Sequence, residues 1–191
     1  KQAVDNLEEI LRETDAVMVA RGDLGVELPI ERVPGVQKEI IRKANQLGKP
    51  VITATQMLES MIENSSPTRA EVTDIHNAVL DGTDAIMLSG ETSIGKHPVA
   101  TVKHMARIAK HAEKFLDYES LRARRQNYVL SNEISVDSSI AHSAVLTAHD
   151  LKAKVVLAFT ESGSTPARIA GFRPNVPVLS LSPNLEVGNK L

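Results

Sequence analysis

Three short apolar runs in the sequence each lead into polar residues of the types that bind metal ions, bind phosphate or move protons. A carboxylate is the kind of ligand that Mg²⁺ prefers, and a hydroxyl group beside a carboxylate can relay a proton. The apolar runs cover residues 17–20, 51–54 and 85–88, and the polar residues that follow them are Asp23, Thr55, Ser89 and Glu91. These three junctions are the candidate functional site.

Asp23 is expected in a glycine-rich turn after the first apolar run. Gly22 and Gly25 carry no Cβ, so the backbone here can approach a ligand closely. A carboxylate with free backbone N–H groups at the end of a buried strand suits a metal–phosphate site. Asp is also common as a plain turn residue, so Asp23 alone leaves both interpretations open. Residues 21–23 also match the cell-adhesion tripeptide Arg-Gly-Asp, but a strand end would present that tripeptide poorly.

The other two junctions also have simpler interpretations. The hydroxyl of Thr55 could bind phosphate oxygens, but a threonine hydroxyl more often bonds to nearby backbone. No histidine lies close in sequence to Ser89 and Glu91 to complete a hydrolase triad. The shared placement of the three junctions favours function, because residues that follow parallel strands gather on one face.

A repeating strand–turn–helix unit must position these residues. The apolar runs begin at positions 17, 51 and 85, which is a period of 34 residues. Helical tetratricopeptide repeats have the same period, but their units contain no strand. Repeated βα units instead predict an α/β fold with a parallel sheet or barrel.

The rest of the chain is predicted to form further helices and a second, partial α/β domain. Residues 24–32 are expected to form a loop, and a boundary near residue 118 separates domains 1–117 and 118–191. Helices are expected at 1–13, 34–47, 68–81, 98–115, 138–151 and 166–172, and from 184 onward, with strands at 155–159 and 176–181. Because a βα protein that opens on a helix lacks the preceding strand, we expect the chain to be part of a longer protein.

Composition excludes several classes of function. The net charge of −2 and the scarcity of aromatic residues argue against nucleic acid and anionic membranes as partners. Residues 122, 124 and 125 form an arginine cluster that is interpreted as a solvated linker. With no cysteine, no disulfide or thiolate metal site can form, which fits a cytoplasmic location. The histidines lack the spacing of a helical zinc site.

A second candidate site lies in the C-terminal part. Hydroxyl and backbone N–H groups between a strand and a helix can bind an anion such as phosphate, although a plain turn is equally consistent with the pattern. The negative charge of Glu161 inside the loop disfavours a doubly charged anion. The candidate anion-binding residues are Thr160, Ser162, Gly163, Ser164 and Thr165.

Taken together, the motifs closely resemble those of the pyruvate kinase family, over essentially the whole chain. The matching segments are Ala-Arg-Gly-Asp-Leu-Gly at 20–25, Ala-Thr-Gln-Met-Leu-Glu-Ser-Met at 54–61, Pro-Thr-Arg-Ala-Glu at 67–71, Leu-Ser-Gly-Glu-Thr at 88–92 and the loop at 160–165. The resemblance implies the last three βα units of a (β/α)₈ TIM barrel, followed by part of a separate C-terminal α/β domain. It also implies phosphoryl transfer from phosphoenolpyruvate to ADP, giving ATP and pyruvate.

The resemblance assigns roles to the candidate residues. Asp23 would bind Mg²⁺ or Mn²⁺, and the backbone N–H groups of Gly22 and Asp23, with Thr55, would hold the phosphoenolpyruvate carboxylate. Ser89 and Glu91 would belong to the group that delivers a proton to the enolate. The family implies a cytoplasmic homotetramer that needs K⁺, whose site lies outside this chain. The loop at 160–165 would bind a phosphorylated effector, and Glu161 argues against fructose bisphosphate.

The sequence also departs from the family pattern. The Lys-Ile-Glu stretch that holds the catalytic lysine and a second metal carboxylate does not occur in it. We therefore expect the chain alone to be inactive, as a piece of a glycolytic enzyme. Two other interpretations are a binding or regulatory module that keeps only the scaffold, and another barrel enzyme that uses phosphoenolpyruvate, although such families lack this full set of motifs.

Overall fold

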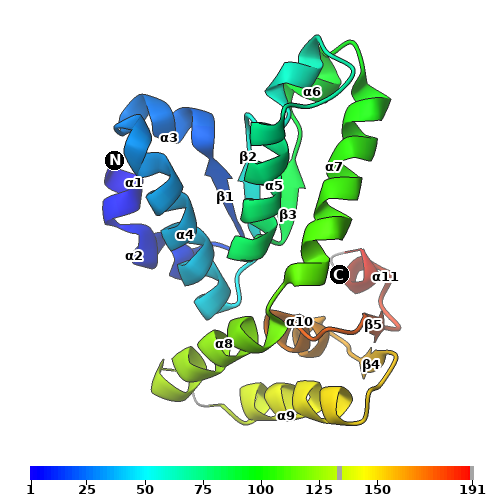
Figure 1. Cartoon of the computed structure of the whole chain (residues 1–191). Coiled ribbons are helices and arrows are strands. Elements are labelled where there is room, and N and C mark those ends of the chain that lie inside the picture. The colour runs from blue at the N-terminus through cyan, green and yellow to red at the C-terminus, as the bar shows by residue number, and fades with distance from the viewer. Residues whose placement is uncertain (133–134, 190–191) are drawn as a thin grey trace. The chain divides into compact units, whose positions relative to one another are not determined.

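The computed structural model describes residues 1–132 and 135–189, which form two compact units. The first unit contains residues 1–45 and 49–116, and the second contains residues 46–48 and 117–191. Each unit has its own parallel sheet (Figure 1).

The first unit is built on a three-stranded parallel sheet. Strands β1 (Val17–Ala20), β2 (Val51–Ala54) and β3 (Ala85–Met87) lie in the order β1-β2-β3. Val17 is paired with Val51, and Ile52 with Ala85, so successive strands are offset by 34 and then 33 residues. The parallel sheet expected from the 34-residue period is therefore present, and the carboxyl ends of its strands lie at one edge.

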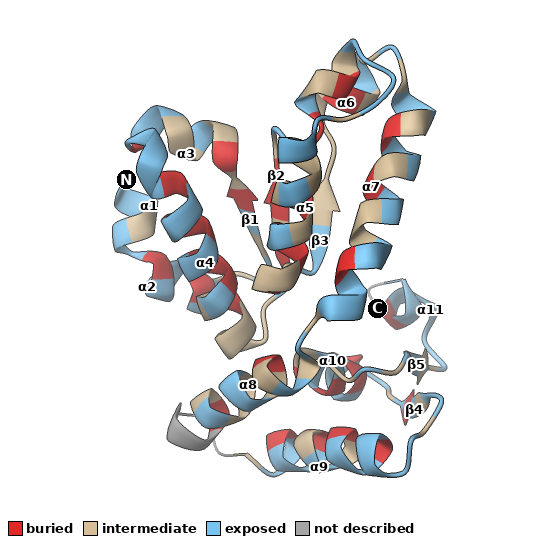
Figure 2. Cartoon of the chain, viewed as in Figure 1, coloured by how far each residue is buried: buried red, intermediate tan, exposed pale blue. Residues whose placement is uncertain are grey.

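Helices connect the strands of the first unit and follow the last one. Helix α4 (Val33–Leu47) leads from β1 to β2, α5 (Arg69–Asp81) from β2 to β3, and α7 (Pro98–Ala112) follows β3. Figure 2 shows buried residues on one side of α4 and exposed residues on the other. The shorter elements are α1 (Gln2–Asp5), α2 (Leu7–Glu13), α3 (Arg21–Glu27), η1 (Ile30–Arg32), η2 (Glu59–Ile62), α6 (Gly90–Ser93) and η3 (Glu113–Phe115).

The core of the first unit extends beyond the sheet into the loop that follows β2. A buried cluster combines this loop with α5 and α7, and its members are Met57, Leu58, Met61, Ile75, Ala78 and Met105. The loop after β2 is therefore packed in the core, although most loops run over a protein surface. Its backbone polar groups must find partners inside the protein.

Local signals set both ends of α5. The Thr68 hydroxyl accepts a hydrogen bond from the Glu71 N–H, and the Glu71 carboxylate accepts one from the Thr68 N–H, which together form a capping box. The helix ends at Gly82, whose φ of 99° lies in the left-handed region that glycine adopts without strain. The sequence predicted both ends of this helix.

Two expectations for the first unit were wrong. Residues 21–27 form helix α3 and residues 30–32 form η1, where a turn and a loop were expected. Two glycines weaken the helix propensity of this stretch, but contacts made by Arg21 across the fold override that local preference. The expected helix at 1–13 is divided at Asn6 into α1 and α2.

The second unit has a two-stranded parallel sheet, β4 (Val156–Phe159) and β5 (Val178–Leu181), joined through α10 (Ser164–Gly171). Helices α8 (Tyr118–Asn132), α9 (Val136–Asp150) and α11 (Leu185–Gly188) complete it. Its buried core is formed by Val129, Ala141, Val145, Ala158, Ile169 and Phe172. In the described part of the chain, no helix is both long and apolar enough to cross a membrane.

The arginine cluster was expected in a solvated linker, but it lies on a helix. Residues 122, 124 and 125 belong to α8. The guanidinium carbon of Arg125 lies 5.8 Å from the centroid of the Phe172 ring, close enough for a cation–π contact. Val129 of the same helix is part of the buried core. Packing against this core explains why a stretch with weak periodicity is helical.

His142 of α9 lies against the core of the second unit. Its ring centroid is 5.2 Å from that of Phe172, and its Nε2 is buried without a hydrogen-bond partner among the described residues. Burial lowers the pKa of His142 below its ordinary value, and the nearby positive charge of Arg122 lowers it further. The folded protein therefore favours the neutral imidazole.

Acidification should destabilise the second unit through His142. Because the folded pKa lies below the unfolded one, the unfolded chain binds more protons between the two values, so stability falls as the pH decreases through that interval. NMR titration should give His142 a lower pKa in the folded protein than in urea. His142→Phe should show a shallower loss of stability between neutral and mildly acidic pH. Equal slopes in the two proteins would contradict this prediction.

Candidate functional site

The carboxyl edge of the first sheet brings together residues from all three βα units. Asp23 lies in the first turn of α3, directly after β1, and its side chain is exposed. Thr55 follows β2, while Ser89 precedes α6 and Glu91 lies within it, after β3. The three junctions singled out in the sequence therefore lie at one edge because the strands are parallel.

The backbone after β2 has an unusual conformation. Thr55 and Gln56 have φ angles of 66° and 53°, in the left-handed region that residues with a Cβ seldom adopt. Such a residue typically costs about 1–3 kcal/mol and persists only where its surroundings hold it in place. Two consecutive residues of this kind therefore need strong contacts.

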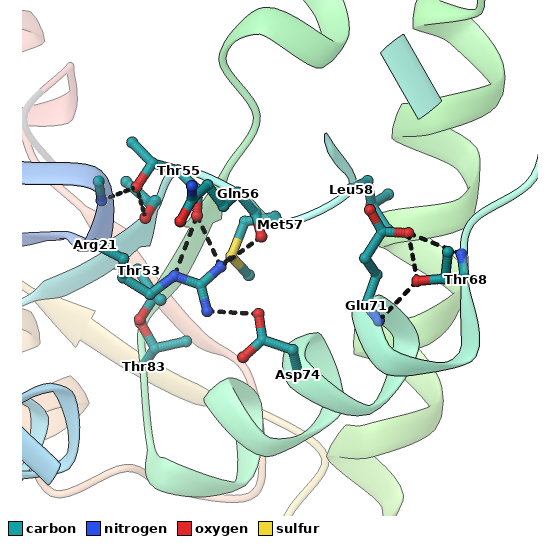
Figure 3. A network of polar contacts seen from close by, with 12 residues as sticks. Arg21, Thr53, Thr55, Gln56, Met57, Leu58, Thr68, Glu71, Asp74 and Thr83 are labelled. Atoms are coloured by element: carbon teal, nitrogen blue, oxygen red, sulfur yellow. Dashed lines mark hydrogen bonds and ion pairs between the residues drawn. The ribbon is translucent and has the colours of Figure 1, made fainter. Parts of the chain in front are cut away.

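Arg21 supplies these contacts (Figure 3). Its Nη2 donates hydrogen bonds to the carbonyl oxygens of Thr55 at 2.7 Å and Gln56 at 2.9 Å, and Nε donates to the Thr55 carbonyl at 3.1 Å. Nη1 forms an ion pair of 2.5 Å with Asp74 of α5. The Met57 sulfur lies 2.8 Å from Nη2. Arg21 is only 9% exposed, so this buried cation has its charge balanced by Asp74 and its N–H groups bound to the left-handed turn.

The Thr55 hydroxyl connects the first two junctions. It accepts a hydrogen bond from the Gly22 N–H at 2.9 Å and lies within hydrogen-bond distance, 2.7 Å, of the Ala54 carbonyl. A Cβ at Gly22 would lie 3.6 Å from the Thr55 hydroxyl, an ordinary contact, so the packing of the protein itself does not demand glycine here. An incoming anion could take over the Gly22 N–H, since N–H groups at such loops bind anions.

Glu91 connects the second and third junctions. Its side chain is almost fully buried, at 1% exposure. One carboxylate oxygen accepts the Leu58 N–H at 3.1 Å, and the other accepts the Ser89 N–H at 2.8 Å. Ser89 thus meets Glu91 through its backbone N–H. A buried carboxylate bound to two backbone N–H groups fixes the loop after β2 against the loop after β3.

A second carboxylate, Glu71, fixes the outer part of the loop after β2. It accepts hydrogen bonds from the Ser60 N–H at 2.7 Å and from the Ser60 hydroxyl at 2.6 Å, in addition to those of the capping box. Burial by itself raises the pKa of Glu71, but the hydrogen bonds from Ser60 and Thr68 outweigh it, so the pKa lies below its ordinary value. Glu71 is therefore ionised at neutral pH.

The side chains of the described residues do not form a metal site by themselves. Residues 1–132 and 135–189 contain no group of three or more His, Cys, Asp or Glu side chains placed to hold a metal ion together. An exposed Asp23 carboxylate still fits Mg²⁺ as a single ligand, because Mg²⁺ commonly keeps several waters and binds only one or two carboxylates.

The candidate anion-binding loop lies in the second unit. Gly163 has a φ of 88°, and its N–H donates to the Thr160 hydroxyl at 2.9 Å. The hydroxyls of Ser162 and Ser164 lie 3.1 Å apart. Helix α10 begins at Ser164 and includes Thr165, two residues earlier than the sequence predicted. The loop therefore gathers its hydroxyl groups just before and within the first turn of a helix.

Sequence reasoning missed Arg21 and Asp74. Arg21 was noticed only within the tripeptide 21–23 and the motif at 20–25, with no role of its own, and Asp74 only as a residue of a predicted helix. The bonds from Arg21 span 34, 35 and 53 positions of sequence, so no local pattern reveals them. Residues 55 and 56 are Thr and Gln, which give no sign of a left-handed turn.

Comparison with protein families finds two matches along the chain. Residues 1–102 match the model described as "Pyruvate kinase, barrel domain", and residues 138–191 match "Pyruvate kinase, alpha/beta domain". The first match covers most of the first unit and the second match lies within the second.

Individual relatives give the same result. Pyruvate kinase of Clostridium acetobutylicum is 47% identical over the whole chain, which covers 40% of that relative. A cytosolic isozyme of pyruvate kinase from Glycine max is 52% identical over 95% of the chain and 35% of its own length. The crystal structure of a pyruvate kinase from Cryptosporidium parvum superimposes on 97% of the chain with a TM-score of 0.93 and 46% identity, and the chain covers 37% of it. The chain thus spans well under half of these relatives.

Replacing Glu91 should loosen the site without removing any apolar packing. In Glu91→Gln one amide oxygen can still accept an N–H, but the amide nitrogen cannot, so one of the Leu58 and Ser89 N–H groups loses its partner. We expect a loss of about 1–3 kcal/mol in the free energy of unfolding, measured in urea. Glu63→Gln, at an exposed residue of the same unit, is the matched control. Equal stability of the two variants would contradict the structural role of Glu91.

Proposed function

The chain belongs to the pyruvate kinase family, and from this premise we propose that it forms part of an active site that transfers phosphoryl from phosphoenolpyruvate to ADP. In this reaction the bond from phosphorus to the enol oxygen breaks and a bond to the terminal ADP oxygen forms. The enolate carbon then takes a proton to give pyruvate. The observation that supports the proposal best is the junction of Gly22, Asp23 and Thr55 at the carboxyl edge of the sheet.

We assign the carboxylate of phosphoenolpyruvate to the Gly22 and Asp23 N–H groups and the Thr55 hydroxyl. The Gly22 N–H donates a hydrogen bond to that hydroxyl at 2.9 Å. A carboxylate oxygen would replace this internal bond and accept from both groups. The protein's part is to orient the substrate, because phosphoryl transfer depends on alignment and charge stabilisation and needs no protein nucleophile.

Asp23 is the proposed ligand of the divalent ion, Mg²⁺ or Mn²⁺. When bound, the ion supplies charge neutralisation at the phosphoryl group and at the enolate oxygen. Asp23 holds its carboxylate in position because it lies in the first turn of α3, next to the anchored Arg21. A second carboxylate and a K⁺ site would come from outside residues 1–191.

Ser89 and Glu91 are proposed to serve the proton-transfer step. Glu91 fixes the Ser89 backbone through the 2.8 Å bond, which leaves the Ser89 hydroxyl to take part in a chain of donors leading to the enolate carbon. In this scheme Glu91 positions Ser89, and the Ser89 hydroxyl relays the proton.

We also propose a wider context for the chain. Residues 1–117 would be the last three βα units of a (β/α)₈ barrel, and residues 118–191 part of a C-terminal domain whose loop at 160–165 takes a phosphorylated effector. The whole protein would be a cytoplasmic homotetramer of glycolysis. Supporting this proposal, the chain matches both family models but covers only 31% to 40% of the length of its relatives.

Residues 1–191 alone should not form pyruvate. The assay contains phosphoenolpyruvate, ADP, Mg²⁺ and K⁺, and we expect no turnover above background, because the family's catalytic lysine and second metal carboxylate do not occur in this sequence. Turnover that copurifies with the chain and disappears in Asp23→Ala would show that those groups are dispensable.

In the full-length protein, Asp23→Asn should weaken metal binding. An amide oxygen is a poorer ligand than a carboxylate, and we expect kcat/KM at saturating Mg²⁺ to fall by a factor of about 100 or more. The Mg²⁺ concentration for half-maximal rate should rise. Glu27→Gln, at an exposed residue of the same helix, should keep the wild-type Mg²⁺ dependence. An unchanged Mg²⁺ dependence in Asp23→Asn would rule out Asp23 as the ligand.

A further inference from the structure

We propose that Arg21 is a positioning residue for substrate binding. It holds Thr55 and Gln56 in their left-handed conformation, and this conformation puts the Thr55 hydroxyl beside the Gly22 N–H. Arg21 thereby sets the affinity for the carboxylate of phosphoenolpyruvate without touching it. This inference rests on the proposed function, because it assumes that the Thr55 hydroxyl and the Gly22 N–H bind that carboxylate.

The guanidinium group of Arg21 contacts the backbone of the turn at three points. Its Nη2 lies 2.7 and 2.9 Å from two successive carbonyl oxygens, and its Nε lies 3.1 Å from the first of them. The two acceptors belong to Thr55 and Gln56, the residues with positive φ. In this turn the two consecutive carbonyls are directed at one planar donor group. The guanidinium therefore binds the strained conformation of the backbone selectively.

Arg21 and Gly22, which both contact Thr55, are adjacent in sequence. The side chain of Arg21 binds the Thr55 carbonyl, while the N–H of the next residue binds the Thr55 hydroxyl at 2.9 Å. Thr55 is thus held on its backbone and its side chain by two neighbouring residues of α3. A change in the first contact must alter the second, because both involve the same short segments.

The Arg21 cation is buried, and its charge is balanced by a carboxylate. Arg21 is 9% exposed, and its counter-charge is Asp74, whose side chain is 38% exposed. Asp74 binds Nη1 and leaves Nε and Nη2 to the carbonyls. The ion pair fixes the rotation of the guanidinium plane, so the planar donor faces the turn.

Lysine cannot replace Arg21 in this arrangement. An ammonium group is a point donor without the planar fork of a guanidinium, so it cannot satisfy Asp74 and both carbonyls in the same geometry. Arg21→Lys keeps the positive charge and so separates the effect of charge from that of donor geometry.

The test uses the full-length protein with steady-state kinetics. We expect Arg21→Lys to raise the KM for phosphoenolpyruvate about tenfold, the loss of roughly one charge-assisted hydrogen bond, with the KM for ADP within about twofold. A merely structural defect would lower the active fraction and kcat without this selective change in KM. Arg12→Lys, at an exposed arginine of α2 that pairs with Glu8, is the matched control and should behave as wild type.

A double-mutant cycle with Thr55→Ala tests whether Arg21 acts through Thr55. If it does, adding Arg21→Lys to Thr55→Ala should change the KM for phosphoenolpyruvate by less than about twofold. The same tenfold rise in both backgrounds would overturn the proposal, as would an unchanged KM in Arg21→Lys. If Arg21→Lys does not fold, Asp74→Asn replaces it in the same cycle. We then expect the KM for phosphoenolpyruvate to rise about two- to fivefold.

Amide hydrogen exchange without substrate separates this inference from the proposed function. Arg21→Lys, or Asp74→Asn in its place, should speed exchange at the Gly22 and Leu58 amides at least about tenfold, while the amides of α7 keep their rates. Unchanged exchange at Gly22 and Leu58 would overturn the positioning role. Suppose that the full-length wild-type protein forms no pyruvate but that exchange responds to the substitution as expected. This result would refute the proposed function and the link to substrate affinity. It would still establish that Arg21 holds the backbone of Thr55.

Discussion

The loop after β2 is held between two buried charges of opposite sign, and the geometry of the candidate site depends on this arrangement. Arg21 binds the carbonyl oxygens of Thr55 and Gln56, and Glu91 binds the N–H of Leu58. The cation binds backbone carbonyl oxygens and the anion binds a backbone N–H, so the backbone of residues 55–58 is fixed at both ends by buried side chains. Burial of either charge would be costly without these bonds and the Asp74 ion pair.

This arrangement also explains why an irregular segment can lie in the core. Met57 and Leu58 are fully buried, and their backbone groups need partners that a strand or a helix would normally supply. Side-chain charges take the place of a ladder of backbone bonds. The site residues Gly22, Thr55 and Ser89 come from three different βα units, and the two buried charges tie these units together. Contacts of this kind preorganise the backbone, and preorganisation lowers the entropic cost of binding a ligand.

The second unit is built on a different plan. Its sheet has two strands, and its core depends on apolar packing around Phe172, with a half-buried histidine kept neutral. The hydroxyl groups of its loop at 160–165 bond to one another and to the local backbone. No buried charge within this described loop plays the part of Arg21 or Glu91. The loop at 160–165 is therefore held by contacts between residues near in sequence, as in an ordinary turn. The candidate site of the first unit is held by contacts between residues far apart in sequence.

The sequence by itself determined the strands, the ends of α5, most of the helices and the family. Apolar runs, the capping box of Thr68 and Glu71, and the glycine at 82 act over a few residues, so they can be recognised in the sequence alone. It also placed Asp23, Thr55, Ser89 and Glu91 at strand ends, and parallel strands bring such ends together.

Only the tertiary structure decided that 21–27 is a helix, that 118–132 packs as one, and that Thr55 and Gln56 are left-handed. The physical reason is the same in each case: the deciding contacts join segments far apart in sequence. The bonds of Arg21 link residues 34, 35 and 53 positions apart, and the cation–π contact of Arg125 reaches Phe172 across the second unit. Side-chain contacts over such separations leave no local pattern, whereas the folded chain brings both partners within hydrogen-bond distance or ring contact.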